Sequence, residues 1–347
     1  MNLSERIESF SKLGEILRES LEGKDDLHSD SLKRLIDNQQ YKNSWFTPGN
    51  VRMAVRSIAE ELTNDNIAKW CSSYPGLENQ PEPLNVGIVM AGNIPLAGFH
   101  DFISVLITGN NLIAKTSSKD PDLIVFISDL LCNINPGFKK HIFFTDKTLA
   151  GINAIIATGS DNTSRYFEYY FGKYPNIIRK NRNSIAIIDG TESESQIHDL
   201  GIDIFSYFGL GCRSVSKIYI PAGYDISILN SRWNAFSDII NHSKYANNYD
   251  FRKAILMVNR ENFTDTGYLL MTENTGLSSP VAVLYYEHYE SPEYVLQQTE
   301  ILKEKIQCVV GTSHIPFGKA QSPHLWDYAD GIDTIEFLLK KKVAGIL

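Results

Sequence analysis

The chain has 347 residues, with 33 lysines and arginines against 41 aspartates and glutamates, so its formal net charge is −8. Hydrophobic residues make up 43% and charged residues 21%, which is typical of a globular protein and excludes an intrinsically disordered one. The acidic balance argues against nucleic acid as a partner. The first ten residues, MNLSERIESF, predict no signal peptide, and no apolar run approaches the roughly 20 residues of a membrane span. We therefore expect a cytoplasmic protein of two large domains.

The first eighty residues predict helices with polar faces. Over residues 5–21 apolar side chains recur every three or four positions, the spacing of an amphipathic helix, although Gly14 interrupts the pattern. A loop rich in proline and turn residues follows over 75–85. This helical preface precedes a different kind of pattern.

From Val86 onwards, short apolar segments alternate with helix-like ones. Strands are predicted at 86–92, 111–117, 141–146, 154–160 and 184–190, and helices at 99–108, 121–133 and 164–171. Segments that are apolar almost throughout are typical of strands buried on both faces, and their alternation with helices indicates βαβ units in a mostly parallel sheet. Such a sheet binds ligands outside the carboxyl ends of its strands, where the segments AGN, KTSS and TGS fall.

A second set of elements follows in the C-terminal half. Strands are predicted at 214–223, 253–258, 267–271, 281–287 and 306–311, with helices at 226–240 and 291–306. The last segment, 333–347, is predicted to be a helix or a strand that docks on another element or on another subunit. The stretch 314–333 is rich in aromatic residues, and we expect it to pack Trp326 and Tyr328 on the core; a role of His314 or His324 in the site is the alternative.

Several common signatures are absent from the sequence. It has no phosphate loop, no dinucleotide fingerprint, no HExxH, no GxSxG and no metal-like histidine cluster, so no metal is expected. The four cysteines are too widely spaced for a zinc ribbon or a disulfide scaffold. Cys212 stands out, because it lies between Gly211 and Arg213 at the start of a predicted strand. Glycines allow a tight turn that exposes the thiol, and Arg213 would favour the thiolate; a small cysteine buried in a turn is the alternative.

The motifs occur in an order that carries a resemblance. AGNIPL (91–96), AKTSSKDP (114–121), ATGS (157–160), a strand and then GLGC (209–212) are similar to the aldehyde dehydrogenase superfamily. More closely, they resemble the acyl-CoA reductase family that includes the fatty-acid reductase of bacterial bioluminescence. The likeness spans about 86–311. It implies an α/β fold with a Rossmann-type cofactor domain over 1–188, a smaller α/β catalytic domain over 189–320, and a tail over 321–347 for docking or oligomerisation.

The resemblance implies roles for two catalytic residues. Cys212 occupies the place of the nucleophile, and Asn93 that of the asparagine whose amide stabilises the oxyanion. An asparagine in a turn before proline is the plainer reading of Asn93.

It also implies a cofactor site. Lys115, followed by Ser117, matches the lysine that meets the adenosine ribose or its 2′-phosphate, which favours NADPH and leaves NADH possible. Thr158, Gly159 and Ser160 match the turn that approaches the pyrophosphate at a helix N-terminus. A surface lysine and an ordinary N-cap serine are the alternatives.

Two departures from the family pattern shape the predicted reaction. The glutamate that activates water in aldehyde-oxidising members is missing near Arg179, and a second family glutamate is replaced at Gly276. Without a base for water, a thioester on Cys212 is spared from hydrolysis. We therefore predict NADPH-dependent reduction of a fatty acyl thioester, on CoA or an acyl carrier, to the aldehyde, by a possible homo-oligomer. The alternatives are an acyl-phosphate reductase of the glutamyl-phosphate type and a non-catalytic acyl-carrier-binding relative.

Overall fold

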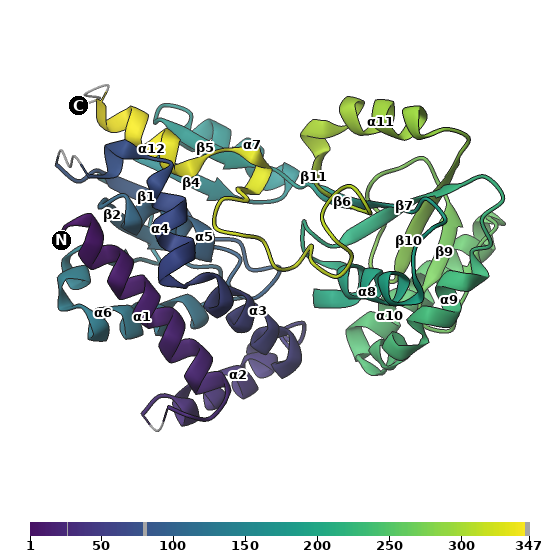
Figure 1. Cartoon of the computed structure of the whole chain (residues 1–347), viewed down its shortest axis with the longest axis horizontal. Helices are drawn as coiled ribbons and strands as arrows, with labels where there is room; N and C mark the ends of the chain where they lie inside the picture. The colour runs from purple at the N-terminus through teal and green to yellow at the C-terminus, as the bar shows by residue number, and fades with distance from the viewer. Residues whose placement is uncertain (26, 79–81, 344–347) are drawn as a thin grey trace. The chain divides into compact units, whose positions relative to one another are not determined.

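The computed structural model describes residues 1–25, 27–78 and 82–343, and it divides into two compact units (Figure 1). The first unit is Met1–Asn181 together with His324–Leu347, and the second is Arg182–Pro323. The sequence-based division at 188 counts the strand Asn183–Ile187 with the first domain, whereas this strand pairs within the second unit. Residues 79–81 of the proline-rich loop and residues 344–347 of the tail lie outside the described residues.

The first unit is built on a five-stranded parallel sheet of order β3-β2-β1-β4-β5. Its strands are β1 (Asn85–Val89), β2 (Asn111–Lys115), β3 (Ile142–Phe144), β4 (Ala154–Thr158) and β5 (Asn176–Arg179). The first four coincide with predicted strands. β5 was not predicted, because it has only four residues and ends in an arginine. Helices α5 (Phe99–Ile107) and α6 (Leu123–Ile134) join β1 to β2 and β2 to β3, and α7 (Asp161–Phe171) joins β4 to β5.

The connection from β3 to β4 contains no helix over its described residues 145–153. Leu149 and Ile152 of this loop are buried, and both lie 3.3 Å from the position that a Cβ on Gly87 of β1 would take. Together with Phe167 and Phe171 of α7 they form a small apolar cluster against the strands. The loop and α7 therefore pack together on the strands.

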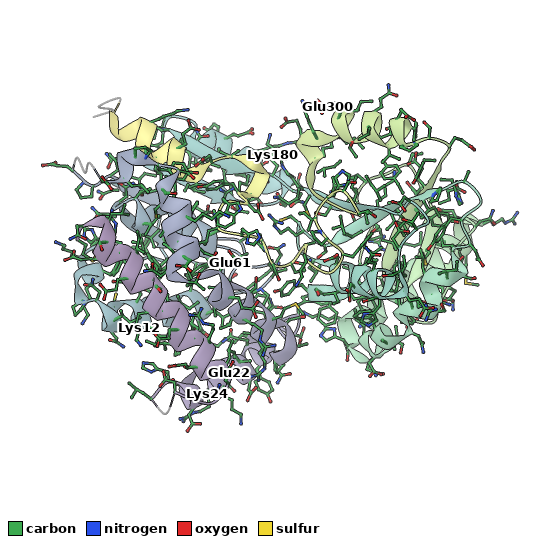
Figure 2. All side chains as sticks on the ribbon, in the orientation of Figure 1. Lys12, Glu22, Lys24, Glu61, Lys180 and Glu300 are labelled. Carbon is green, nitrogen blue, oxygen red and sulfur yellow. The ribbon has the colours of Figure 1, made fainter. Side chains whose placement is uncertain are left out.

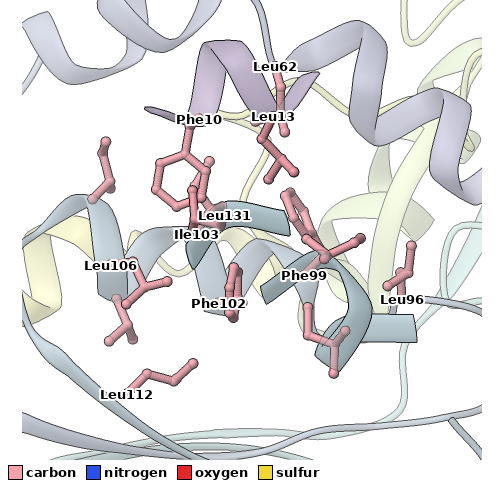
Figure 3. Close-up of a cluster of buried hydrophobic side chains, with 14 of the residues drawn as sticks. Phe10, Leu13, Leu62, Leu96, Phe99, Phe102, Ile103, Leu106, Leu112 and Leu131 are labelled. Carbon is pink, nitrogen blue, oxygen red and sulfur yellow. The ribbon is translucent and has the colours of Figure 1, made fainter. Parts of the chain in front are cut away.

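The predicted helical preface consists of four helices, α1 (Leu3–Leu21), α2 (Ser29–Lys42), α3 (Pro48–Glu61) and α4 (Asn64–Ser72). Phe10 and Leu13 of α1 are buried in the same cluster as Phe99 and Leu131 (Figure 3). α1 is unbroken at Gly14, where a Cβ would lie only 2.6 Å from that of Leu62, so glycine permits this close approach. The outer faces are polar: Lys12, labelled in Figure 2, forms an ion pair with Glu15 at 2.8 Å.

The C-terminal segment forms a helix, α12 (Thr334–Val343), which contacts α5. The loop before it packs as expected, because Trp326 and Tyr328 contact the core of the first unit. The Tyr328 hydroxyl accepts a hydrogen bond from Nε1 of Trp70 at 2.8 Å.

The second unit contains a six-stranded sheet of order β11-β6-β7-β10-β9-β8, parallel except for the pairing of β8 with β9. Its strands are β6 (Asn183–Ile187), β7 (Val215–Pro221), β8 (Thr264–Asp265), β9 (Leu270–Glu273), β10 (Val283–Tyr289) and β11 (Ile306–Val310). Its α-helices are α8 (Glu194–Phe205), α9 (Ser227–Trp233), α10 (Ser243–Asn259) and α11 (Pro292–Ile301). Short 3-10 helices in the two units are Pro75–Leu77, Pro136–Lys140, Ser206–Gly209, Asn234–Asn241, Lys303–Lys305 and Ala329–Gly331.

The strand predicted at 253–258 is wrong, because these residues belong to α10. The buried side chains of this helix, Tyr245, Tyr249 and Leu256, recur at helical spacing, whereas Met257 and Val258 are exposed. An apolar run of five residues, 254–258, fits a strand or the end of a helix equally well when it is read alone. The overall α/β class with parallel sheets is confirmed. Among the described residues, no helix is both long enough and apolar enough to cross a bilayer.

Candidate active site

The predicted cofactor residues gather at one edge of the sheet in the first unit. β1 is flanked by β2 and β4, and the chain turns to opposite faces of the sheet after these two strands. The carboxyl ends of β1, β2 and β4 lead into Asn93, Ser117 and Ser160 respectively. This is the switch point at which open parallel sheets bind their ligands.

Two of these loops are in close contact. A Cβ on Gly92 would lie 2.6 Å from the Cβ of Ser117 and 3.2 Å from that of Lys119. Real Cβ atoms do not approach side chains so closely, so only glycine fits at position 92. The loop that carries Asn93 therefore packs closely against the loop that follows Lys115.

Asn93 itself is exposed, in the loop between β1 and α5. Three residues later Leu96 has a positive φ of 58°, an unusual conformation for a leucine. The Leu96 N–H donates to Oδ2 of Asp120 at 2.8 Å, and Asp120 is buried. Burial raises the pKa of this carboxyl group to about 6. Asp120 therefore holds the turn that presents Asn93.

The turn from β4 to α7 has the form expected of an anion-facing helix start. Thr158 ends β4, and Ser160 is the N-cap of α7, accepting from the Thr163 N–H at 3.4 Å. A Cβ on Gly159 would lie 2.9 Å from the Phe167 ring, so glycine allows the helix to pack on this turn. A phosphate is stabilised in front of such a helix N-terminus.

A cavity of about 670 Å³ opens beside these residues in the same unit. Val89 of β1 and Lys115 of β2 line it, with Lys147 from the β3–β4 loop and Lys173 from the end of α7. Tyr166 and Tyr170 of α7 add aromatic surface, and none of the lining residues is acidic. The cavity is thus cationic and aromatic. Lys147 and Lys173 were not predicted, although Lys147 follows a strand at the expected edge.

Cys212 lies in the second unit, in the turn that precedes β7. The Ser214 N–H donates to the Gly211 carbonyl at 3.0 Å, which closes a turn with Cys212 at its first central position. Cys212 is exposed, whereas Cys71 and Cys308 are buried and Cys132 is half-buried. Of the four cysteines, Cys212 is the most exposed residue.

The backbone just before this turn is strained. Tyr207 and Phe208 have positive φ angles of 52° and 58°, and Gly209 follows at 74°. Side-chain-bearing residues pay a conformational cost in this region, and such residues cluster at functional sites. Both aromatic side chains are buried, which holds the conformation in place.

A buried serine, Ser184, forms a hydrogen bond to the Cys212 peptide. The Ser184 hydroxyl on β6 donates to the Cys212 carbonyl oxygen at 2.9 Å, and it lies 3.0 Å from the Cys308 sulfur. Ser184 and Cys308 are both buried. Sequence reasoning missed Ser184, since nothing local connects it to a residue 28 positions away. Arg213 donates to the Ala320 carbonyl at 3.4 Å, and its influence on the thiol stays a prediction.

Arg179 and Gly276 lie at or near the sequence positions of the two missing glutamates, and each has a defined set of hydrogen bonds. Arg179 is buried, with Nη1 at 2.6 Å from both carboxylate oxygens of Asp101 and Nη2 at 3.0 Å from the Thr334 hydroxyl. The Asp101 carboxylate is therefore neutralised in an ion pair. The Gly276 N–H donates to Oδ1 of Asn274 at 2.7 Å, within a loop.

The two histidines considered for the site lie in different units. His324 belongs to the first, where Nδ1 lies 3.0 Å from a Glu61 oxygen and the ring stacks on Trp326. His314 is exposed in a turn of the second unit. Within residues 1–25, 27–78 and 82–343, no group of three or more potential ligand side chains could hold a metal ion.

Comparison with known proteins supports the resemblance. No protein-family model matches the chain. Long-chain acyl-protein thioester reductase 2 of Photobacterium leiognathi is 24% identical over 191 residues, covering 50% of this chain and 40% of that protein. The long-chain acyl-protein thioester reductase of Photorhabdus laumondii is 20% identical over 252 residues, covering 64% and 52%. The chain thus spans about half the length of the curated relatives it matches, and its likeness to thioester reductases of the bioluminescence type is confirmed.

Solved structures establish the fold. Aldehyde dehydrogenase 21 from Physcomitrella patens, in complex with succinate, aligns with 98% of this chain and 84% of its own at a TM-score of 0.64 and 11% identity. An indole-3-acetaldehyde dehydrogenase in complex with NAD+ aligns with 90% and 72% at a TM-score of 0.65 and 12% identity. The fold is aldehyde-dehydrogenase-like, as the sequence predicts.

Proposed function

We propose that the chain is a nicotinamide-dependent oxidoreductase that reduces a fatty acyl thioester to an aldehyde through an acyl-enzyme on Cys212. The observation that carries the proposal is the exposed Cys212 thiol in a strained turn at the start of β7, in a chain with an aldehyde-dehydrogenase-like fold. The thioester reductases it resembles supply the reaction class.

The chemistry begins at the thiol. The Cys212 thiolate attacks the thioester carbonyl carbon, and the Cys212 backbone N–H stabilises the negative charge that develops on the carbonyl oxygen. The resemblance assigns the same stabilising role to the side-chain amide of Asn93. The carbon–sulfur bond to the departing thiol breaks, and that thiolate takes up a proton. When bound, NADPH supplies the hydride that reduces the new thioester carbon. The resulting thiohemiacetal collapses, which releases the aldehyde and restores the Cys212 thiolate.

The absence of a water-activating base supports reduction over hydrolysis. Arg179 stands near the place of the family glutamate, and its partner Asp101 is held in a buried ion pair. A thioester on Cys212 therefore persists until hydride or another thiol arrives. The second departure concerns the cofactor instead, because Gly276 stands where the family has a glutamate close to the nicotinamide ribose.

NADPH is the proposed cofactor, with NADH as the alternative. Lys115, Lys147 and Lys173 line one cavity without an acidic neighbour among the lining residues, which suits a 2′-phosphate on the adenosine ribose. Tyr166 and Tyr170 offer flat surfaces on which an adenine ring can stack. Ser117 and the Thr158–Ser160 turn are assigned to the phosphate side of the same cofactor. A reduced cofactor and a free thiol suit the predicted cytoplasmic location.

Mass spectrometry of the protein after incubation with long-chain acyl-CoA, without NADPH, tests the proposal. We expect one thiol-linked acyl group on Cys212, which hydrolyses slowly and disappears quickly when NADPH or free CoA is added. Cys212→Ala should lose both the adduct and the reduction but retain NADPH binding, whereas Cys132→Ala should behave as the unmodified chain. An adduct on another cysteine would contradict the assignment of Cys212 as the nucleophile.

A reduction assay with both classes of substrate, together with the adduct measurement, separates the alternatives. Reduction of an acyl phosphate in preference to the thioester would indicate a reductase of the glutamyl-phosphate type. Cofactor binding without an adduct from any acyl-CoA or acyl-carrier thioester would indicate a non-catalytic carrier-binding protein. The oligomeric state, proposed as a homo-oligomer, is measured by light scattering on the same samples.

A further inference from the structure

A second cavity lies at the other edge of the sheet in the first unit. Its volume is about 340 Å³, and it is lined by residues of α1, of the turn before β2 and of the segment before β3. β2 begins at Asn111 and β3 at Ile142, so Asn110 and His141 mark the amino ends of these strands. The candidate cofactor site is at the carboxyl ends. The two sites are therefore separated by the length of the strands.

Arg6 of α1 lines this cavity and is almost completely buried, with 1% of its surface exposed. Its Nη1 donates to the Met1 carbonyl at 3.0 Å. Its Nε and Nη2 have no hydrogen-bond partner among the described residues. Burial lowers the pKa of Arg6 to about 10, so the guanidinium still carries its charge at neutral pH.

A buried charge without a counter-charge is costly, and buried polar groups in proteins are almost always hydrogen-bonded. Within the described residues, no carboxylate lies within ion-pair distance of Arg6. Lys140 and His141 line the same cavity, and Glu82 is the acidic residue among its lining. The nearby Glu5 accepts the Asn2 N–H at 2.8 Å, in the cap of α1. Burial lowers the pKa of His141, so its ring is neutral at neutral pH, and the lining side chains Arg6 and Lys140 carry two positive charges against one negative charge on Glu82.

We propose that this cavity binds an oxyanion of the phosphate class, with Arg6 as its central ligand. Nε and Nη2 form one edge of the guanidinium plane, and their two parallel N–H groups match two oxygens of a phosphate. Lys140, the last residue of the 3-10 helix before β3, adds a second positive charge to the lining. The volume exceeds that of a phosphate ion, so a small organic phosphate also fits.

Binding of inorganic phosphate to the full chain tests the proposal by isothermal titration calorimetry, at constant ionic strength set with chloride. We expect saturable binding that Arg6→Met weakens about tenfold or more, because it removes both donors of the fork. Lys140→Gln should weaken binding severalfold. Lys139→Gln is the matched control, because Lys139 is its exposed neighbour and does not line the cavity, and it should bind as the original chain does.

Thermal unfolding gives a second readout that needs no catalytic activity. Phosphate should raise the melting temperature of the original chain, and Arg6→Met should lose this effect while melting at a higher temperature in phosphate-free buffer. If Arg6→Met does not fold, Glu82→Gln decides, since loss of a carboxylate from the lining should tighten phosphate binding. Glycerol 3-phosphate, titrated in parallel, binds more tightly than phosphate if the site takes an organic phosphate and more weakly if it takes the free ion.

Three results would overturn the proposal. One is absence of saturable phosphate binding to the original chain. Another is phosphate binding by Arg6→Met and Lys140→Gln that is as strong as binding by the original chain. A strong loss of stability in Glu82→Gln, without a gain in affinity, would instead make Glu82 the counter-charge of Arg6 and would equally rule out the oxyanion.

Discussion

Gly92 and Ser117 are in such close contact that a Cβ on Gly92 would lie 2.6 Å from the Cβ of Ser117. The contact joins the loops after β1 and β2, which carry the predicted oxyanion asparagine and the predicted cofactor lysine. The two loops are therefore packed directly against each other, and a substitution in one should displace the other.

Gly92→Ala should destabilise the first unit by about 1–3 kcal/mol, because the added methyl group overpacks the contact. It should also weaken NADPH binding, since Ser117 must move. Gly92→Ala combined with Ser117→Gly should recover most of the stability. Gly49→Ala is the control, because the nearest atom to its new Cβ is 4.0 Å away. Urea unfolding and cofactor titration measure both effects, and full NADPH affinity in Gly92→Ala would separate this contact from the cofactor.

Lys115→Ala, Lys147→Ala and Lys173→Ala test the choice of cofactor. If these lysines meet the 2′-phosphate, each should weaken NADPH about tenfold, the value of a charge-assisted hydrogen bond, and NADH much less. Fluorescence titration with both cofactors gives the ratio. Lys180→Ala is the matched control, since Lys180 pairs with Glu168 on the same unit and does not line the cavity. Equal losses for both cofactors would remove the phosphate-binding role.

Ser184→Ala should lower kcat for acyl reduction with little change in KM, because the Cys212 carbonyl loses its buried donor. The expected loss of stability is about 1 kcal/mol. The rate of alkylation of Cys212 by iodoacetamide should change as well, which a remote packing effect would not produce. Cys308→Ala keeps the hydrogen bond from Ser184 to the Cys212 carbonyl, so its kcat and its rate of alkylation should stay close to those of the original chain. Ser231→Ala, exposed on α9, serves as the control.

Arg179→Met should cost about 3–5 kcal/mol of stability, because it leaves the Asp101 carboxylate buried without its partner. The double variant Arg179→Met with Asp101→Leu should be considerably more stable than Arg179→Met alone. Urea unfolding of the single and double variants gives the coupling energy. Additive effects would show that the two side chains do not depend on each other.

The buried carboxyl group of Asp120 should make the free energy of unfolding depend on pH. Burial raises its pKa from 3.8 to about 6, so between these values the folded chain binds more protons than the unfolded chain. The stability that this group contributes is therefore largest below about pH 4 and is lost as the pH rises to about 6. Asp120→Asn keeps an acceptor for the Leu96 N–H and should remove this part of the slope, with a gain of up to about 3 kcal/mol at neutral pH.

Asp203 contributes a second part of the same slope, because burial also raises its pKa to about 6. Urea unfolding at about pH 4.5 and about pH 7 should therefore show a residual dependence in Asp120→Asn, which Asp203→Asn reduces further. An unchanged slope in Asp120→Asn would mean that its carboxyl titrates normally.

Much of the fold is readable in the sequence because it depends on local pattern. The runs of apolar residues at β1, β2 and β4 fill strands buried on both faces, and their hydrophobicity is visible without any partner. The glycine turn of Cys212 is likewise local, since two glycines and the strand that follows lie within a few residues. The confirmed resemblance rests on the order of these local motifs.

Other features are decided only by tertiary contacts. β5 becomes a strand because it pairs with β4. Residues 253–258 become part of α10 because Leu256 is buried on the same face of this helix as Tyr245 and Tyr249. Ser184 reaches Cys212 only because β6 and β7 are neighbours in the sheet. The burial of Arg6 and its unpartnered nitrogens follow from helix packing that no sequence window contains. Desolvation and hydrogen bonding depend on atoms brought together from distant positions. The local pattern therefore determines most of the elements, whereas the folded chain decides the ambiguous ones and which side chains meet.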